Sequence, residues 1–60
     1  PARHVERLRL DAARLLLEKP LSLKAIAAMV GFGATARMTA AFERRLGVAP
    51  ALYRRLHTAG

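Results

Sequence analysis

The sequence predicts an all-α fold of about four helices, and three observations support this class. Apolar residues recur at helical spacing along the 60 residues, no stretch is a credible strand, and glycines and prolines divide the chain into four segments. A chain this short buries a modest share of its surface and is marginally stable. It has no cysteine, which excludes a disulfide framework and a cysteine-based zinc site.

The first segment is expected to be one long helix over residues 2–19, because Pro1 suits a first helical turn and the next proline is Pro20. At about 100° per residue, one apolar stripe is expected to face the core: Val5, Leu8, Ala12, Leu15 and Leu16. A second apolar stripe points well away from the first: Leu10, Ala13 and Leu17. Two stripes imply two packing partners, so we expect the second stripe to be exposed in this chain or covered by another copy.

The second helix is expected after Ser22, whose hydroxyl can accept a hydrogen bond from a free amide of the first turn. Its inward face is formed by Leu23, Ile26, Ala27 and Val30. Gly31 can adopt the left-handed conformation that ends a helix, and Phe32 in the turn is expected to fill the core between two helices. The Gly-Phe-Gly break therefore predicts the turn of a helix-turn-helix.

The third helix is expected from about residue 34 to residue 46, and Gly47 ends it. Its inward residues are Met38, Phe42 and Leu46, with Phe42 among the most buried side chains. Its outward face consists of small residues flanked by arginines. Small residues permit close approach to another surface, so this face is interpreted as a recognition surface.

The last segment predicts a short helix that begins near Pro50. Tyr53 and Leu56 are expected to face inward, and Arg54 and Arg55 outward.

The charge balance favours a polyanionic partner. Eleven Lys and Arg against four Asp and Glu give a net charge of +7, and the pI is near 11.7. No apolar run approaches the ~18 residues that span a bilayer, and the N-terminus lacks the apolar core of a signal peptide. We expect a soluble, cytoplasmic protein, and a first residue other than methionine predicts a segment of a longer chain.

No residue pattern predicts catalysis or metal binding. His4 and His57 are far apart, and neither has a carboxylate at ligand spacing. Three acidic residues of the first helix are interpreted as partners of neighbouring arginines: Glu6, Asp11 and Glu18. We expect no enzymatic activity, no cofactor and no metal.

The stretch "LKAIAAMVGFGATARMTAAFERRLGVAPALYRR", residues 23–55, resembles the C-terminal signature of the AraC/XylS family of transcriptional regulators. The residues that match are Ile26, Ala27, Gly31, Phe32, Phe42, Arg45, Gly47, Pro50, Tyr53 and Arg54. The upstream "PARHVERLRLDAARLLLE" resembles the linker helix of the family. The resemblance implies a homeodomain-like helix-turn-helix module, in which residues 2–19 are the linker helix and residues 22–57 are the second helix-turn-helix with its closing helix.

In that family, two helix-turn-helix modules joined by the linker helix each occupy a major-groove segment. Residues 1–60 would then be a partial DNA-binding domain, and double-stranded DNA would be its partner. A missing first module would pack on Leu10 and Leu17, and a sensor domain would lie elsewhere in the parent chain. No membrane partner is implied.

The resemblance also implies the site residues. Base contacts carry over to the outward residues of the early recognition helix: Thr35, Ala36, Arg37, Thr39 and Ala40. Phosphate contacts are expected at Ser22, Lys24, Arg44, Arg54 and Arg55. Ala36 and Ala40 stand where relatives are often polar or carry arginine, so hydrogen-bonded base recognition is poor and a thymine methyl contact is the most they offer. Arg37 can reach a base edge or a phosphate.

Plainer interpretations of these residues stay open. Arg37 and Arg44 could lie on a solvated helix face, and Thr35 could be the N-cap of the third helix. Arg54 and Arg55 could instead interact favourably with the negative, C-terminal end of the dipole of the last helix.

The whole chain also has alternatives. A basic amphipathic helical module of this composition could bind an anionic membrane surface or a partner protein. The Leu10 and Leu17 stripe could instead pair with a copy of itself.

Overall fold

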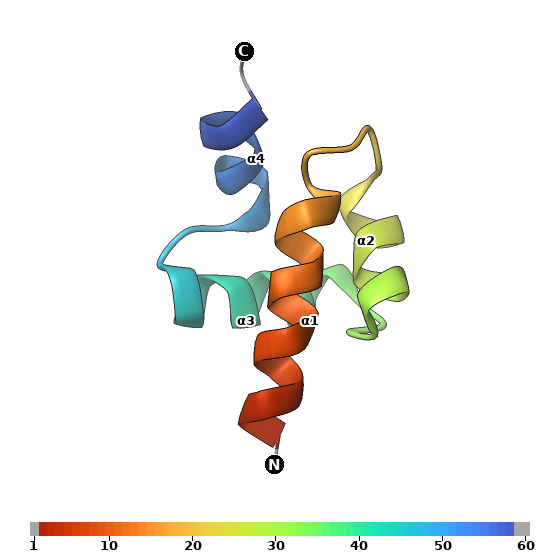
Figure 1. Cartoon of the computed structure of the whole chain (residues 1–60), viewed down its shortest axis with the longest axis vertical. Helices are drawn as coiled ribbons and strands as arrows, with labels where there is room; N and C mark the ends of the chain where they lie inside the picture. The colour runs from red at the N-terminus through yellow and green to blue at the C-terminus, as the bar shows by residue number, and fades with distance from the viewer. Residues whose placement is uncertain (1, 59–60) are drawn as a thin grey trace.

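The computed structural model contains four α-helices (Figure 1). These are α1 (Ala2–Leu16), α2 (Leu23–Val30), α3 (Thr35–Leu46) and α4 (Pro50–Thr58). The structure describes residues 2–58, and side chains within residues 4–57. Pro1, which was expected to open the first helix, lies outside the described residues. Within residues 2–58 there is no strand, which confirms the predicted all-α fold.

Helix α1 is shorter than predicted: it ends at Leu16 and not at residue 19. The amide of Lys19 bonds the carbonyl of Leu16, three residues back, at 3.0 Å. This tighter turn precedes Pro20, which has no amide hydrogen with which to continue the helix. The chain therefore leaves the helix one turn early and turns into α2.

The helix-turn-helix turn between α2 and α3 confirms the prediction from the Gly-Phe-Gly break. The Ser22 hydroxyl accepts a hydrogen bond from the Ala25 amide at 3.1 Å, which caps α2. Gly31 ends α2 with φ +98°, and the Phe32 amide donates to the Ala27 carbonyl at 2.9 Å. α2 and α3 are turned by 81° relative to each other. This turn sets the direction in which α3 leaves the core.

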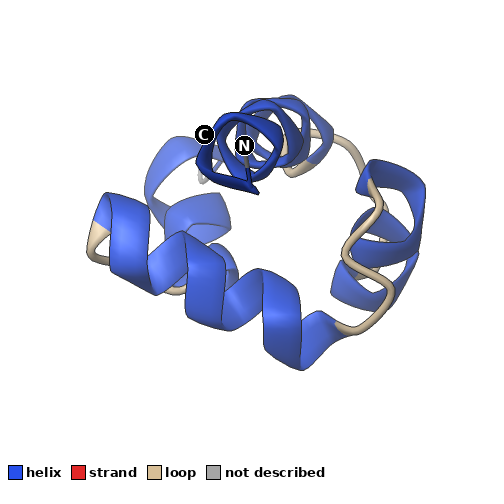
Figure 2. Cartoon of the chain, turned by 90° about the horizontal axis from the view of Figure 1, so that it is seen from below, coloured by secondary structure: helices blue, strands red, loops and turns tan. Residues whose placement is uncertain are grey.

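The core lies where α1, α2 and α3 meet. Helix α1 crosses in front of α3 in Figure 1, and Figure 2 looks nearly along α1, with α3 running across below it. Its buried members are Leu10, Ala13, Leu17, Ile26, Ala27, Met38, Ala41 and Phe42. Phe42 is fully buried, which confirms that prediction. The Tyr53 ring of α4 meets the Phe42 ring edge-on, with the centroids 5.3 Å apart, so α4 joins the core through an aromatic contact.

The packing of α1 reverses the predicted assignment of its two stripes. Leu10 and Leu17, predicted to be exposed, are 3% and 1% exposed, and Ala13 between them is fully buried. Leu8 and Leu15, predicted to face the core, are 55% and 68% exposed. Both stripes have helical spacing, so periodicity cannot choose between them. Each stripe also has an alanine near its middle, and the contacts with α2 and α3 bury the stripe of Leu10, Ala13 and Leu17.

Of the remaining members of the predicted core stripe, two follow the same correction and Leu16 faces the core as predicted. Val5 and Ala12 are exposed, and Leu16 is half-buried against the core. We call the exposed residues Val5, Leu8, Ala12 and Leu15 the outer stripe of α1.

Two further inward predictions were wrong. Leu46 and Leu56 are both exposed. Leu46 is the last residue of α3, and Leu56 lies in the part of α4 that extends away from α3 toward the C-terminus (Figure 1). Both residues share a helix face with residues that reach the core. They lie beyond the end of the core, so both stay exposed.

Candidate nucleic-acid interface

The outward side of α3 is built from very small side chains beside an arginine. Ala36, Arg37 and Ala40 are exposed, whereas Thr35 and Thr39 are half-buried. The N-cap of α3 is Ala34, which makes no side-chain capping bond, so the interpretation of Thr35 as N-cap was wrong. The fully exposed side chains on this side are therefore two methyl groups and one guanidinium, and base contacts by Thr35 and Thr39 stay predictions.

The phosphate candidates outside α3 lie in different surroundings. The Ser22 oxygen already serves the Ala25 amide at the start of α2. Lys24 in the first turn of α2 and Arg55 on α4 are both exposed. A direct phosphate contact is therefore open to the charged side chains Lys24 and Arg55, and stays a prediction for each.

Arg54 has a structural role that the sequence did not indicate. Its guanidinium donates to three backbone carbonyls: Leu17 (3.0 Å), Lys19 (3.3 Å) and Leu21 (2.5 Å). The end of α1 leaves carbonyls without helical partners, and a planar guanidinium can bond several of them at once. Arg54 thereby ties α4 to the connection between α1 and α2. Its predicted phosphate contact would have to compete with these bonds.

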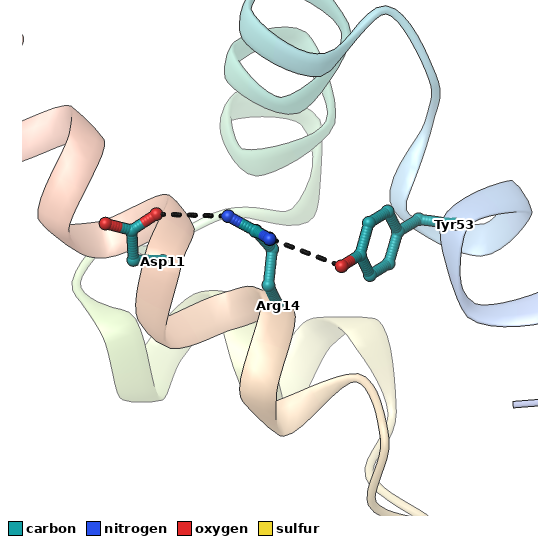
Figure 3. Close-up of polar contacts among 3 residues, drawn as sticks. All are labelled: Asp11, Arg14 and Tyr53. Carbon is teal, nitrogen blue, oxygen red and sulfur yellow. Dashed lines mark hydrogen bonds and ion pairs between the residues drawn. The ribbon is translucent and has the colours of Figure 1, made fainter. Parts of the chain in front are cut away.

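Arg14 makes a second link between α1 and α4 (Figure 3). Its Nε donates to the Tyr53 hydroxyl at 3.3 Å, and its Nη1 lies 3.5 Å from an oxygen of Asp11. The Tyr53 hydrogen bond, and then the Asp11 charge, raise the pKa of Arg14. The predicted pairing of Asp11 with a neighbouring arginine is thus confirmed, while Glu18 forms no ion pair within the described residues.

Glu6 pairs with arginines of another helix and not with neighbours on its own. Its carboxylate accepts a hydrogen bond from Arg44 at 2.7 Å and lies 3.5 Å from Arg45 Nε. The Glu6 side chain is only 25% exposed. The Arg44 hydrogen bond lowers the pKa of Glu6 from its ordinary value of 4.5, and the charges of both arginines act in the same direction. Arg44 thus faces solvent with its charge partly neutralised.

The lowered pKa of Glu6 makes an acid-dependent contribution to stability. Because the pKa of Glu6 is lower in the folded than in the unfolded chain, its ionised carboxylate stabilises the fold at pH values above the unfolded-state pKa near 4.5. This stabilisation is lost as the pH falls through the folded-state pKa. When the pH is lowered from about 7 to about 3, we expect the melting temperature of Glu6→Gln to fall by less than that of the wild type.

Thermal melts followed by circular dichroism across this range measure the difference. Asp11→Asn is the control, because Asp11 is an exposed acid on the same helix and, among the residues described, pairs with Arg14 alone. If the melting temperatures of the wild type and Glu6→Gln fell equally on acidification, the ion pairs of Glu6 with α3 would contribute nothing to the pH dependence of stability.

A groove of about 580 Å³ lies between the N-terminal half of α1 and the flank of α3. Its lining residues are Val5, Glu6, Arg9, Phe32, Arg37, Ala40, Ala41 and Arg44. Three arginines against one carboxylate make this groove basic. Sequence reasoning missed Arg9, although Arg9 is one helical turn from Val5 and shares that flank of α1.

The described residues offer neither a cluster of metal ligands nor a single helix that could span a membrane. No group of three or more His, Cys, Asp or Glu among them could hold a metal ion. Within the same residues no single helix is long and apolar enough to cross a membrane, and the pair α2 and α3, which together would be, is bent by 81°.

A capped helix, a glycine turn and an exposed third helix with a basic flank define a helix-turn-helix DNA-binding domain. A family model described as "Helix-turn-helix domain" matches residues 1–56, and the chain belongs to this family, in its AraC-type form. The matched residues form a DNA-binding helix-turn-helix segment of the transcription-regulator type.

A curated relative agrees with this assignment. The chain is 46% identical over 56 residues to the HTH-type transcriptional regulator Rv1931c of Mycobacterium tuberculosis, a match that covers 92% of this chain and 22% of that protein. The chain thus spans about a fifth of the length of this relative. No solved structure gives a significant match.

Proposed function

We propose that this segment is the second helix-turn-helix of a sequence-specific cytoplasmic regulator and that α3 docks in the major groove of duplex DNA. The observation that carries the proposal is the outward side of α3, where Ala36 and Ala40 are exposed beside Arg37. A helix enters the major groove with its early residues against base edges, and small side chains let the backbone come close. The net charge of +7 supports a polyanionic partner.

The same residues limit what this module can recognise. The methyl groups of Ala36 and Ala40 can contact thymine methyl groups, and only Arg37 among the three exposed residues can hydrogen-bond a base or a phosphate. Binding by this segment is therefore dominated by phosphate contacts and has weak sequence preference. The larger share of specificity falls to the rest of the parent regulator.

A first helix-turn-helix module cannot use Leu10 and Leu17, because this chain already buries both. We place its contact on the outer stripe of α1, where Leu8 and Leu15 are the most exposed apolar residues. The greater length of the relative leaves room for such a module and for a sensor domain.

Duplex DNA binding should depend steeply on salt. With four or five phosphate contacts, log K is expected to fall with log[salt] at a slope of roughly −3 to −5. Arg37→Ala should weaken binding several-fold, because Arg37 projects beside the base-contact positions. Fluorescence anisotropy of one labelled duplex over a salt series measures both effects.

Arg7→Ala is the matched control for Arg37→Ala. Arg7 is also exposed, but it lies on the side of α1 that carries Asp11 and Arg14, away from the groove that Arg37 lines. Equal losses for the two variants, or affinity independent of salt, would refute docking through α3. Tighter binding to anionic vesicles than to duplex DNA would favour a membrane-surface module instead.

A further inference from the structure

The basic groove between α1 and α3 contains two arginines that have no partner among the described residues. Arg9 of α1 and Arg37 of α3 are both exposed, and neither makes a hydrogen bond or ion pair within residues 4–57. The third arginine of the groove, Arg44, is held by Glu6 at 2.7 Å. The groove thus combines two unpaired cations from different helices with one carboxylate that is already engaged.

The Arg9 side chain lies against the helix-turn-helix turn. A Cβ built on Gly31 would lie 3.0 Å from Arg9 Nε, so the Arg9 side chain lies directly over the glycine that ends α2. The partial negative charge at the C-terminal end of α2 favours a guanidinium there. Arg9 therefore lies beside the turn that leads into α3 and lines the same groove as Arg37.

From this geometry we propose that Arg9 and Arg37 together bind one backbone phosphate of duplex DNA at the edge of the major groove. The inference rests on the proposed docking of α3. A phosphate presents several acceptor oxygens, and two planar guanidiniums can each donate to it in pairs. Ala40, Ala41 and Phe32 line the groove without any side-chain acceptor that would compete for these donors.

The site adds α1 to the DNA-contacting surface. The assignment based on family resemblance gives this helix only a linking and packing role. A phosphate held from both α1 and α3 restrains rotation of the module about the axis of α3. It therefore orients the recognition helix as well as adding affinity.

Charge-matched substitutions on α1 test the site. Arg9→Gln in this 60-residue chain should weaken binding to a labelled duplex by about 3- to 10-fold at low salt, and should lower the magnitude of the salt slope by about 1. Arg7→Gln removes the same charge two residues away and should leave both quantities close to wild type. Arg9→Lys, which keeps the charge but loses the paired donors, should fall between wild type and Arg9→Gln.

The double variant Arg9→Gln with Arg37→Ala examines the shared phosphate. If both arginines bind one phosphate, the second substitution costs less than it does alone, whereas additive losses would overturn a shared site. Thermal melts of each variant confirm that the fold is retained, and Arg9→Lys tests the same contact if Arg9→Gln does not fold.

Failure of this site and failure of the proposed function give different results. Unchanged binding in Arg9→Gln, with a loss in Arg37→Ala, would overturn the Arg9 contact and leave α3 docking intact. Equal losses in Arg9→Gln and Arg7→Gln would show that only net charge matters, which also overturns the site. Absence of duplex binding by the wild-type chain would refute the proposed function itself.

Discussion

Phe42→Ala is expected to leave the chain largely unfolded. The Phe42 ring is fully buried where three helices meet, and Tyr53 of α4 packs against its edge. Truncating such a ring costs about 3–5 kcal/mol. A chain of 60 residues has a total stability of roughly 3–9 kcal/mol, and small domains lie toward the lower end. The loss is therefore comparable to the whole free energy of unfolding.

Far-UV circular dichroism melts measure this effect. Leu56→Ala is the control, since Leu56 on α4 is 66% exposed and its truncation should change the melting temperature little. A helical Phe42→Ala variant that melts cooperatively near the wild-type temperature would mean that α3 does not present Phe42 to the core.

Leu17→Ala and Leu15→Ala should differ by several kcal/mol, although they make the same chemical change two residues apart. Leu17 is 1% exposed and belongs to the core, so its truncation should cost about 2–5 kcal/mol. Leu15 is 68% exposed, and its truncation should change the free energy of unfolding by no more than about 0.5 kcal/mol. Urea unfolding of the two variants gives the free energies directly.

The order of these two costs decides which stripe of α1 faces the core. A larger loss for Leu15→Ala than for Leu17→Ala would restore the assignment expected from the sequence. If this segment belongs to a longer regulator, as proposed, and a first module covers the outer stripe, Leu15→Ala should become more costly in that longer protein. Repeating the measurement on that protein therefore tests the proposed location of the first module.

Local chemistry determined much of this fold before any tertiary contact was known. The Ser22 hydroxyl and the glycines Gly31 and Gly47 mark helix ends because a cap or a left-handed residue is needed there, and each acts within a few residues. The same local rules, together with the glycine turn, predicted the helix-turn-helix and the exposed small residues of α3. Phe42 was also identified correctly, because all the large apolar residues of α3 lie on its inward face.

Only the tertiary structure decided which stripe of α1 is buried and what its charged residues contact. Two apolar stripes on one helix have equal periodicity, and the choice depends on how closely α2 and α3 can approach. Glu6 and Arg44 are 38 residues apart in sequence, and Arg54 and Leu17 are 37 apart. Long flexible side chains bind whichever groups the tertiary fold brings within reach. Helical spacing therefore could not predict that Glu6 pairs with arginines of α3 or that Arg54 bonds carbonyls at the end of α1.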